Sequence, residues 1–239
     1  MERLSKNDVL VLARTSGDAS FSDLSGLNLR GVELLGMRFD GSNLKGADLS
    51  SANLSGSSFR NADLSGCNLG NSNFAGCSFT QARLDKADLT HSSFVGADFT
   101  EATLLEANFT NANISCAVFE KADLTRANIQ MTDGAMIRCS GAVMVKIHAR
   151  SASLICAVLS GCDLRGANLH GTDLSNANLF SADLREADIL DATLTAADLT
   201  NADIRQVRLK RTDLTRAKFD GMKYDEELGE LLSGFTRQK

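Results

Sequence analysis

The side chains of this sequence that could carry chemistry are its aspartates, cysteines and histidines. Paired carboxylates can act as general acid and base, and clustered Cys and His can bind metal ions. The three histidines, His91, His148 and His170, are widely spaced, and no two of the six cysteines form a CxxC pair. No nucleophile-elbow, dinucleotide-binding, phosphate-binding or HExxH motif is present. We therefore predict no catalytic residues, no cofactor-binding residues and no metal ligands.

Six aspartates are separated from one another by multiples of 20 residues and would form a column of carboxylates if the chain repeats with a period of 20. Such a column suits either acid–base chemistry or hydrogen bonding from the neighbouring backbone, which Asp side chains commonly accept. We favour the backbone role, because no catalytic motif accompanies the column. The six residues are Asp23, Asp63, Asp123, Asp163, Asp183 and Asp203.

A five-residue repeat positions all of these side chains. An apolar residue, here called the centre, falls at nearly every fifth position from Leu24 to Phe219 without an insertion or deletion. A small residue, usually Ala, stands two positions before the centre, and Asp or Asn usually stands between them, as in ADLSS at 47–51. Neither a helix nor a strand has a period of five, so the chain must turn a corner at each pentad and stack on itself.

The number of pentads in one coil follows from centres of the same residue type that recur at every fourth pentad. If a coil contains four pentads, these identical centres stack on one another, and forty pentads make ten coils. At about 4.8 Å between stacked backbones, the rod would be about 50 Å long. The clearest recurrences are a Phe series, Phe39, Phe59, Phe79, Phe99 and Phe119, and a Leu series, Leu24, Leu44, Leu64, Leu84, Leu104 and Leu124.

The repeat resembles the pentapeptide-repeat family over residues 22–221. The resemblance implies an all-β fold, a right-handed quadrilateral β-helix with the centre and the small residue inside. Residues 1–21 and 222–239 would be helical caps on this single domain. Four cysteines take inward positions, where free Cys behaves as a small hydrophobe. These are Cys67, Cys77, Cys139 and Cys162.

Both ends of a stacked β-rod need covering. Ser5 and Asp8 have capping-box spacing, and Gly17 can end a helix, which predicts a helix over 5–16. Asp225 can cap a second helix, which would cover the last coil as a lid or make an end-to-end dimer contact. Its apolar face would contain Leu228, Leu231, Leu232 and Phe235.

The repeat is weakest over 131–150. The centres there include Gly134, Cys139 and Ala149, and larger residues, Ile137 and Ile147, replace the small residue before the last two. This exchange of sizes preserves core volume approximately. Gly134 has no such compensation, so we expect a bulge or small cavity there. We favour a tolerated distortion over a functional kink.

The charges are spread over the four sides of the predicted rod. The net charge is −5, and three sides are close to neutral, with acids and bases in similar numbers. Some members of the family are proposed to mimic DNA and bind gyrase, which requires a dense acidic stripe. This chain has no such stripe and no frame-breaking loop, so it looks more like the cyanobacterial members. We expect no direct contact with nucleic acid.

One side is poor in charge, the side whose centres begin at Leu34 and recur at every fourth pentad. Such a strip on a rigid rod is a candidate surface for a protein partner or a second copy, although it could equally be an inert solvated face. Its exposed candidates are Ala75, Val95, Cys116, Met136, Ile155 and Cys156. A second candidate is a basic patch near the C-terminal end, which could meet an acidic partner or simply be solvated: Arg205, Arg208, Lys210 and Arg211.

Together these features predict a non-enzymatic scaffold for protein–protein interaction, a monomer or an end-to-end dimer. The alternatives are a topoisomerase-protecting protein and a module of a secreted bacterial effector. No export signal and no long apolar run of membrane-spanning length is present, so we expect a cytoplasmic location and no membrane contact. The sequence also contains no Pro and no Trp, as expected if stacked coils use their amides and enclose a narrow interior.

Overall fold

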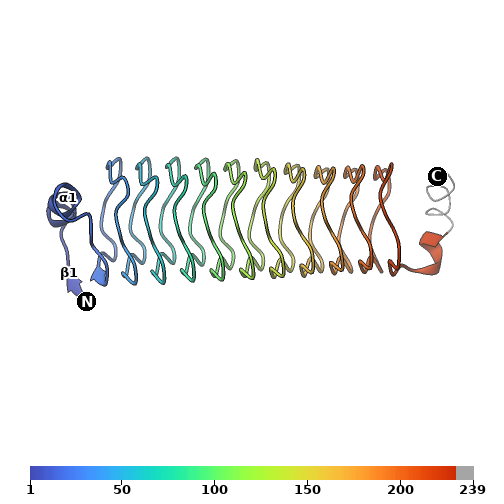
Figure 1. The fold of residues 1–239 in the computed structure, drawn as a ribbon, viewed down its shortest axis with the longest axis horizontal. Helices are drawn as coiled ribbons and strands as arrows, with labels where there is room; N and C mark the ends of the chain where they lie inside the picture. Colours follow the sequence, from blue (N-terminus) through green and yellow to red (C-terminus); the bar gives the residue numbers. More distant parts are fainter. Residues whose placement is uncertain (230–239) are drawn as a thin grey trace.

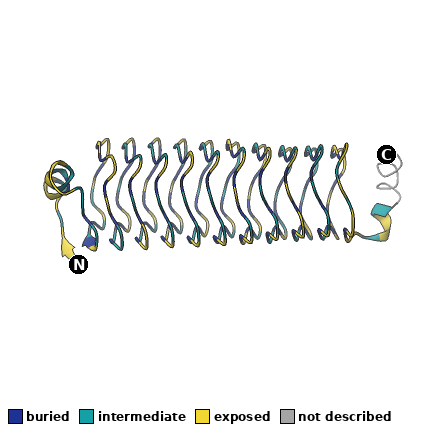
Figure 2. Ribbon diagram, viewed as in Figure 1, coloured by how far each residue is buried: buried dark blue, intermediate teal, exposed yellow. Residues whose placement is uncertain are grey.

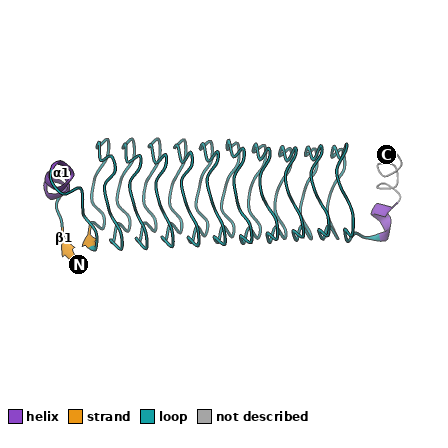
Figure 3. Ribbon diagram, in the orientation of Figure 1, coloured by secondary structure: helices purple, strands orange, loops and turns teal. Residues whose placement is uncertain are grey.

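The described residues form a rod, with the N-terminus at one end and residues 226–229 at the other (Figure 1). The computed structural model describes residues 1–229. Along the rod, the residue before each centre forms a parallel bridge with its equivalent four pentads later, from Asp18 with Arg38 to Asp203 with Lys223. The chain is therefore a β-helix solenoid that completes one coil every four pentads, as the Phe and Leu series predicted. Each bridge is one residue long, so the coils are drawn as loops between the helical ends (Figure 3).

All five backbone N–H groups of a regular pentad donate a hydrogen bond. Two donate to the following coil, one to the preceding coil, and one closes the turn within the same coil. The fifth belongs to the residue after the centre and donates to the Asp or Asn side chain two positions earlier. In the pentad 47–51 the bonds are Leu49 N–H to Asn68 O (2.7 Å), Ser51 N–H to Gly70 O (3.0 Å), Asp48 N–H to Leu27 O (3.0 Å), Ala47 N–H to Leu44 O (2.8 Å) and Ser50 N–H to Asp48 Oδ1 (3.0 Å).

The corners of the coil are type II turns. Every fifth residue from Phe21 to Gly221 has a left-handed backbone, with φ between 54° and 70°. This residue is the third of a four-residue turn, and the left-handed conformation is costly for β-branched side chains. None of these positions is Val, Ile or Thr, whereas Gly and Asn are frequent. The corner geometry therefore restricts the residue type at the exposed edge of the rod.

The centre and the small residue are buried along nearly the whole rod, and they alternate with exposed residues in every coil (Figure 2). Successive rings of the predicted Phe series stack with centroids 4.8–5.0 Å apart. Phe74 and Phe94 make a second stacked pair at 5.2 Å. These separations are close to the spacing between coils, so identical residues in one column pack face to face.

The weak segment 131–150 stays in register. The N–H of Gly134 donates to the carbonyl of Ser153 in the following coil at 2.8 Å. A Cβ added to Gly134 would lie 3.0 Å from Leu154 Cδ2 and 3.3 Å from Ile114 Cγ1. The bulge or cavity expected at Gly134 is therefore absent from this described segment, because side chains from the adjacent coils fill the space. The size-exchanged residues are buried as predicted: Ile137 and Ile147.

Helix α1 (Lys6–Arg14) covers the N-terminal end, and it is shorter than the predicted 5–16. Ser5 is its N-cap: the N–H of Asp8 donates to Ser5 Oγ at 3.2 Å, and the N–H of Ser5 donates to Asp8 Oδ2 at 2.7 Å. Val9 is fully buried. After the helix, the N–H of Gly17 donates to Leu12 O at 2.8 Å with a φ of 65°. The capping residues and the terminating glycine are thus confirmed.

Strand β1 (Glu2–Arg3) was not predicted. It pairs in parallel with β2 (Ser22–Asp23). The N–H of Leu4 also donates to Asp23 O at 3.0 Å, which is 19 residues later in the chain. The same separation joins donor and acceptor in regular coils, as in Leu24 N–H to Asn43 O. Residues 2–4 therefore act as a fragment of a preceding coil and protect the first edge of the rod.

At the other end, residues 226–229 are helical. Asp225 precedes this helix as predicted, but its carboxylate accepts a hydrogen bond from Gln206 N–H in the previous coil. In a regular coil that amide would donate to the backbone carbonyl of residue 225, and the regular coil has ended there. Leu228 is half-buried and packs against the core. The other predicted contact residues, Leu231, Leu232 and Phe235, lie outside the described residues.

Candidate functional site: an uncharged corner of the rod

The structure brings all six residues of the predicted interaction face to one corner. Ala75, Val95 and Ile155 occupy the second position of the type II turn, and Cys116, Met136 and Cys156 occupy the left-handed third position. We call these turn residues the uncharged corner, because no charged residue occurs at them in nine successive coils. They are residues 35–36, 55–56, 75–76, 95–96, 115–116, 135–136, 155–156, 175–176 and 195–196.

The uncharged corner exposes isolated apolar side chains between small ones. Val95 is 38% exposed, Met136 is 55% exposed and Ile155 is 36% exposed. Leu35, which the sequence reasoning missed, lies on the same corner and is 59% exposed. The signal for Leu35 was its register with Ser55 and Ala75, which follow it at intervals of one coil. At about 4.8 Å per coil, the corner is a strip about 40 Å long.

The predicted basic patch is largely neutralised. Arg208 pairs with Asp188, Nη1 to Oδ2, at 2.9 Å, and Arg211 pairs with Asp191. Arg205 pairs with Asp203, Nη2 to Oδ2, at 2.6 Å. Lys210 is the member of the patch without a carboxylate partner within residues 1–229. The patch therefore presents much less positive charge than its sequence suggests.

The Asp column bonds to the backbone, as we favoured. In all six cases the Asp Oδ1 accepts the N–H of the residue two positions later, at 2.9–3.2 Å. This bond supplies an acceptor for the one pentad amide that has no backbone partner. The carboxylates of the column therefore serve as hydrogen-bond acceptors for the backbone rather than as a general acid and base.

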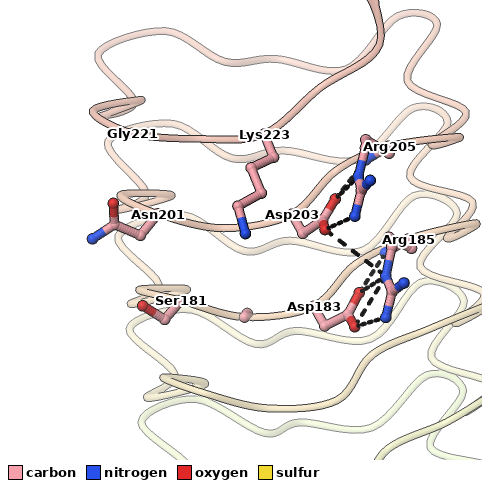
Figure 4. A pocket seen from close by; sticks show the side chains of 9 residues that line it. Ser181, Asp183, Arg185, Asn201, Asp203, Arg205, Gly221 and Lys223 are labelled. Carbon is pink, nitrogen blue, oxygen red and sulfur yellow. Dashed lines mark hydrogen bonds and ion pairs between the residues drawn. The ribbon is translucent and has the colours of Figure 1, made fainter.

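A pocket of about 630 Å³ lies over the C-terminal end of this column (Figure 4). Arg185 holds Asp183 at 2.6 Å, Nη2 to Oδ2, and its Nε lies 3.9 Å from Asp203 Oδ2 in the following coil. Hydrogen bonds from Arg185 and Arg205 hold the pKa values of Asp183 and Asp203, respectively, below their usual range. The two guanidinium and two carboxylate charges compensate each other, so the only uncompensated charge among the lining residues is that of Lys223. Lys223 extends between Asn201 and Asp203 at its rim.

The inward cysteines are inert thiols. Burial raises the pKa of Cys67, Cys77 and Cys162 to about 12, so each remains protonated at neutral pH. Each Sγ–H donates to the carbonyl of a residue in the preceding coil, as for Cys77 to Leu54 O at 3.0 Å. Ser72 makes the same bond to Leu49 O at 2.8 Å. These cysteines are therefore both core filler, as predicted, and hydrogen-bond donors.

No group of three or more His, Cys, Asp or Glu side chains within residues 1–229 is arranged to hold a metal ion. In the same part of the chain, no helix has the length and apolarity that crossing a bilayer requires. A second pocket, of about 280 Å³, is a surface dip lined by Leu105, Val145 and charged neighbours.

The fold and its surface thus define a repeat solenoid whose coils carry side chains in register at every fourth pentad. Family models match nearly the whole rod: "Pentapeptide repeat region" over 56–138, and "Pentapeptide repeats (8 copies)" over 22–61, 142–179, 177–216 and 192–223. The chain belongs to the pentapeptide repeat family.

Among solved structures, HetL from the cyanobacterium Nostoc sp. strain PCC 7120 is similar, with a TM-score of 0.66 and 25% identity. The match covers 92% of this chain and 96% of HetL, a protein described as involved in the regulation of heterocyst differentiation. QnrB1, a plasmid-mediated fluoroquinolone resistance protein, matches with a TM-score of 0.46 and 21% identity over 92% of this chain and 96% of its own. No curated protein sequence matches the chain.

Proposed function

We propose that this chain is a non-enzymatic scaffold that binds a protein partner along its uncharged corner. The scaffold would be a right-handed, four-sided β-helix of about ten coils. The observation that carries the proposal is the absence of charge from the nine turns of that corner, while each of the other three corners carries both acids and bases over the same coils. Interface cores are depleted in charged residues in the same way.

Rigidity supports this role. Every coil is bridged to both neighbours through the described rod, so the exposed side chains of one corner stand at fixed intervals. Binding of a partner that fits these intervals costs little conformational free energy on the side of the scaffold, because the scaffold is already ordered. The favoured partner is a protein whose contacting face also carries little charge.

The charge layout does not favour the gyrase-binding alternative. The carboxylates at the C-terminal end of the Asp column are held by arginines two residues away, as in Asp163 with Arg165 at 2.6 Å. A phosphate-like stripe needs unpaired negative charge. A supercoiling assay with a quinolone, showing protection at low micromolar protein, would reverse this judgement.

Substitutions with matched exposure test the docking surface. Val95→Glu places a charge on the uncharged corner, whereas Leu105→Glu places one on a different corner at a residue that is also 38% exposed. We expect Val95→Glu to weaken capture of the partner from the native host by at least about tenfold, as a buried unpaired charge would. Leu105→Glu should leave capture unchanged.

A second pair uses the opposite charge: Ile155→Arg on the corner, and Val143→Arg off it, at 36% and 37% exposure. Sedimentation of the purified chain separates self-association from binding of a different protein. If both corner variants capture partners and sediment like the wild type, the uncharged corner is not the docking surface.

A further inference from the structure

The left-handed column of the uncharged corner has glycines in one half and larger residues in the other. All four residues before Cys116 are Gly, and none of the four after it is. A Cβ built on any of these glycines would meet nothing within 4 Å beyond its chain neighbours, so the space above each is open. The column reads Gly36, Gly56, Gly76, Gly96, Cys116, Met136, Cys156, Asn176 and Ala196. One half of the column therefore offers space of the kind that the side chains of the other half would fill.

A two-fold axis brings these halves together in two copies of the chain. An axis that lies along the turn of Cys116, perpendicular to the rod, makes the copies antiparallel, and each column of the corner faces its own reversed sequence. Met136 then faces Gly96 of the second copy, and Cys156 faces Gly76. No two large apolar side chains face each other in either column. The pairs of the neighbouring column are Leu35 with Thr195, Ser55 with Ser175, Ala75 with Ile155 and Val95 with Ala135.

The charges beside the corner have the same reversed symmetry. The residues that follow the corner and precede the next centre form one column of bridges, from Asp18 to Lys218 in steps of twenty. Under the same axis, every charged residue of this flanking column faces a charge of opposite sign. The pairs are Asp18 with Lys218, Arg38 with Asp198 and Asp98 with Arg138. On the other side of the corner, at residues 33 to 193 in steps of twenty, no two charged residues face each other.

The flanking charges select one register. A shift of one coil places Glu33 opposite Asp173 in one direction, or Arg38 opposite Lys218 in the other. A shift of two coils in either direction places a charged residue of the flanking column opposite its own copy. Like charges in opposition suppress such wrong pairings. The register centred on Cys116 is therefore the one that both bulk and charge favour.

The area of the contact is small. A specific interface of about 800 Å² per partner contains about 20–30 residues on each side. The eighteen turn residues of the corner would therefore bury about 600 Å² per partner, which is at the low end for a specific, transient contact. The flanking charges add little affinity, because they already have partners within one chain, as for Lys218 Nζ at 3.2 Å from Asp198 Oδ2. Such a dimer would have a dissociation constant in the micromolar range.

We propose that the uncharged corner binds a second copy of this chain, antiparallel, about a two-fold axis at Cys116. The assignment rests on the proposed docking role of that corner and names its partner. The observation that carries it is that a single axis matches bulk in the two turn columns and charge in the flanking column. The dimer is lateral, so it differs from the end-to-end contact considered for the C-terminal helix.

The two exposed cysteines of the column test the axis. The two copies of Cys116 meet at the axis, whereas the two copies of Cys156 lie about 19 Å apart, four coil spacings, and a disulfide needs Cα atoms within about 7 Å. The reduced full-length chain is treated with diamide, which takes the two electrons and two protons of a thiol pair as the disulfide forms. Nonreducing electrophoresis then measures the covalent dimer. We expect Cys156→Ser to form this dimer as fast as the wild type and Cys116→Ser to lose it.

Equal rates of crosslinking in Cys116→Ser and Cys156→Ser would overturn the proposed axis. Random collision, or a parallel pair of rods, would bring Cys156 to its own copy as often as Cys116. Serine already occupies left-handed corners, as at Ser151 and Ser181, so both variants should fold. Circular dichroism checks that they do.

Filling the open space tests the match in bulk. Gly96→Asn places a side chain where Met136 of the second copy would lie, and Gly66→Asn places the same side chain on another corner. Both glycines are left-handed, with φ values of 64° and 65°, and Asn already occupies such corners, as at Asn71. In sedimentation equilibrium, Gly96→Asn should weaken dimerisation about fivefold or more, as overpacking does, and Gly66→Asn should leave it unchanged. Equal dimerisation by the two variants would refute the match.

The failure of this dimer and the failure of the docking role give different results. If the wild type sediments as a monomer while Val95→Glu still loses capture of a different protein, the second copy is not the partner, and the docking surface stands. If the wild type is monomeric and Val95→Glu captures partners normally, both proposals fall.

Discussion

The hydrogen bonding of the pentad makes a specific prediction about proline, which this chain lacks entirely. Two valines of one coil, Val143 and Val145, differ in whether their backbone N–H groups donate a hydrogen bond. The N–H of Val143 donates to Ala122 O in the preceding coil at 2.9 Å. The N–H of Val145 has no acceptor within residues 1–229, because the residue two positions earlier is Val143 and has no side-chain oxygen.

The free energy of each substitution follows from these contacts. Val143→Pro removes a bond between coils, leaves the Ala122 carbonyl unpaired and places ring atoms against it. An unpaired buried carbonyl costs about 1–3 kcal/mol, and the clash raises the expected loss to about 3 kcal/mol or more. Val145→Pro falls at the second position of a type II turn, where Pro is favoured. The restricted unfolded chain then stabilises the fold by about 0.4–1 kcal/mol.

Urea unfolding followed by far-ultraviolet circular dichroism measures both variants. We expect the midpoint of Val145→Pro to equal or exceed that of the wild type. The Val143→Pro midpoint should fall, or its transition should split, because a broken bridge divides a chain of nearest-neighbour contacts. Equal destabilisation by the two prolines would refute the reasoning, because it would mean that absence of Pro reflects something other than the amide bonds.

Two further predictions concern thiols and protons. Cys77→Ser should change the free energy of unfolding by less than about 1 kcal/mol, because Ser57 and Ser72 already make the equivalent hydrogen bond to a backbone carbonyl. Cys139→Ser instead places a hydroxyl at a fully buried centre and should lower the free energy of unfolding by about 1–3 kcal/mol. Urea midpoints that fall equally in both would contradict the assigned bond. Acid should also destabilise the rod: the folded pKa of Asp183 lies below its unfolded value, so its stabilisation is present above about pH 4 and is lost as the pH falls through the folded pKa. Asp183→Asn should flatten the dependence of unfolding free energy on pH by at most about 1.4 kcal/mol per pH unit in that range, and an unchanged slope would argue against this linkage.

The periodic features of the fold were predictable because each depends on residue type at a repeated position. Phe39 and Phe59 revealed the coil length, and Asp48 represents the side chains that complete the pentad's hydrogen bonds. The same periodicity would have placed Leu35 on the uncharged corner.

The unpredicted features occur once and have no pattern to reveal them. Strand β1 is two residues long, too short for an alternation to be read. Asp225 looked like an ordinary helix cap, and only the coil geometry shows that Gln206 N–H needs its carboxylate. Ion pairs such as Arg211 with Asp191 depend on side-chain conformations, which a sequence does not specify.

In each regular pentad, two N–H groups donate to the following coil and one donates to the preceding coil, which gives the rod a polarity. Two N–H groups of each pentad point toward the C-terminal end and one points back, so a bare last coil would offer mainly donors and a bare first coil mainly acceptors. Uncovered ends of different molecules would be complementary, head to tail, and could extend into a fibre without limit. The N–H of Leu4 occupies the carbonyl of Asp23 at one end, and the Asp225 carboxylate accepts the N–H of Gln206 at the other. Each terminal segment therefore satisfies one of the backbone groups that such an extension would use.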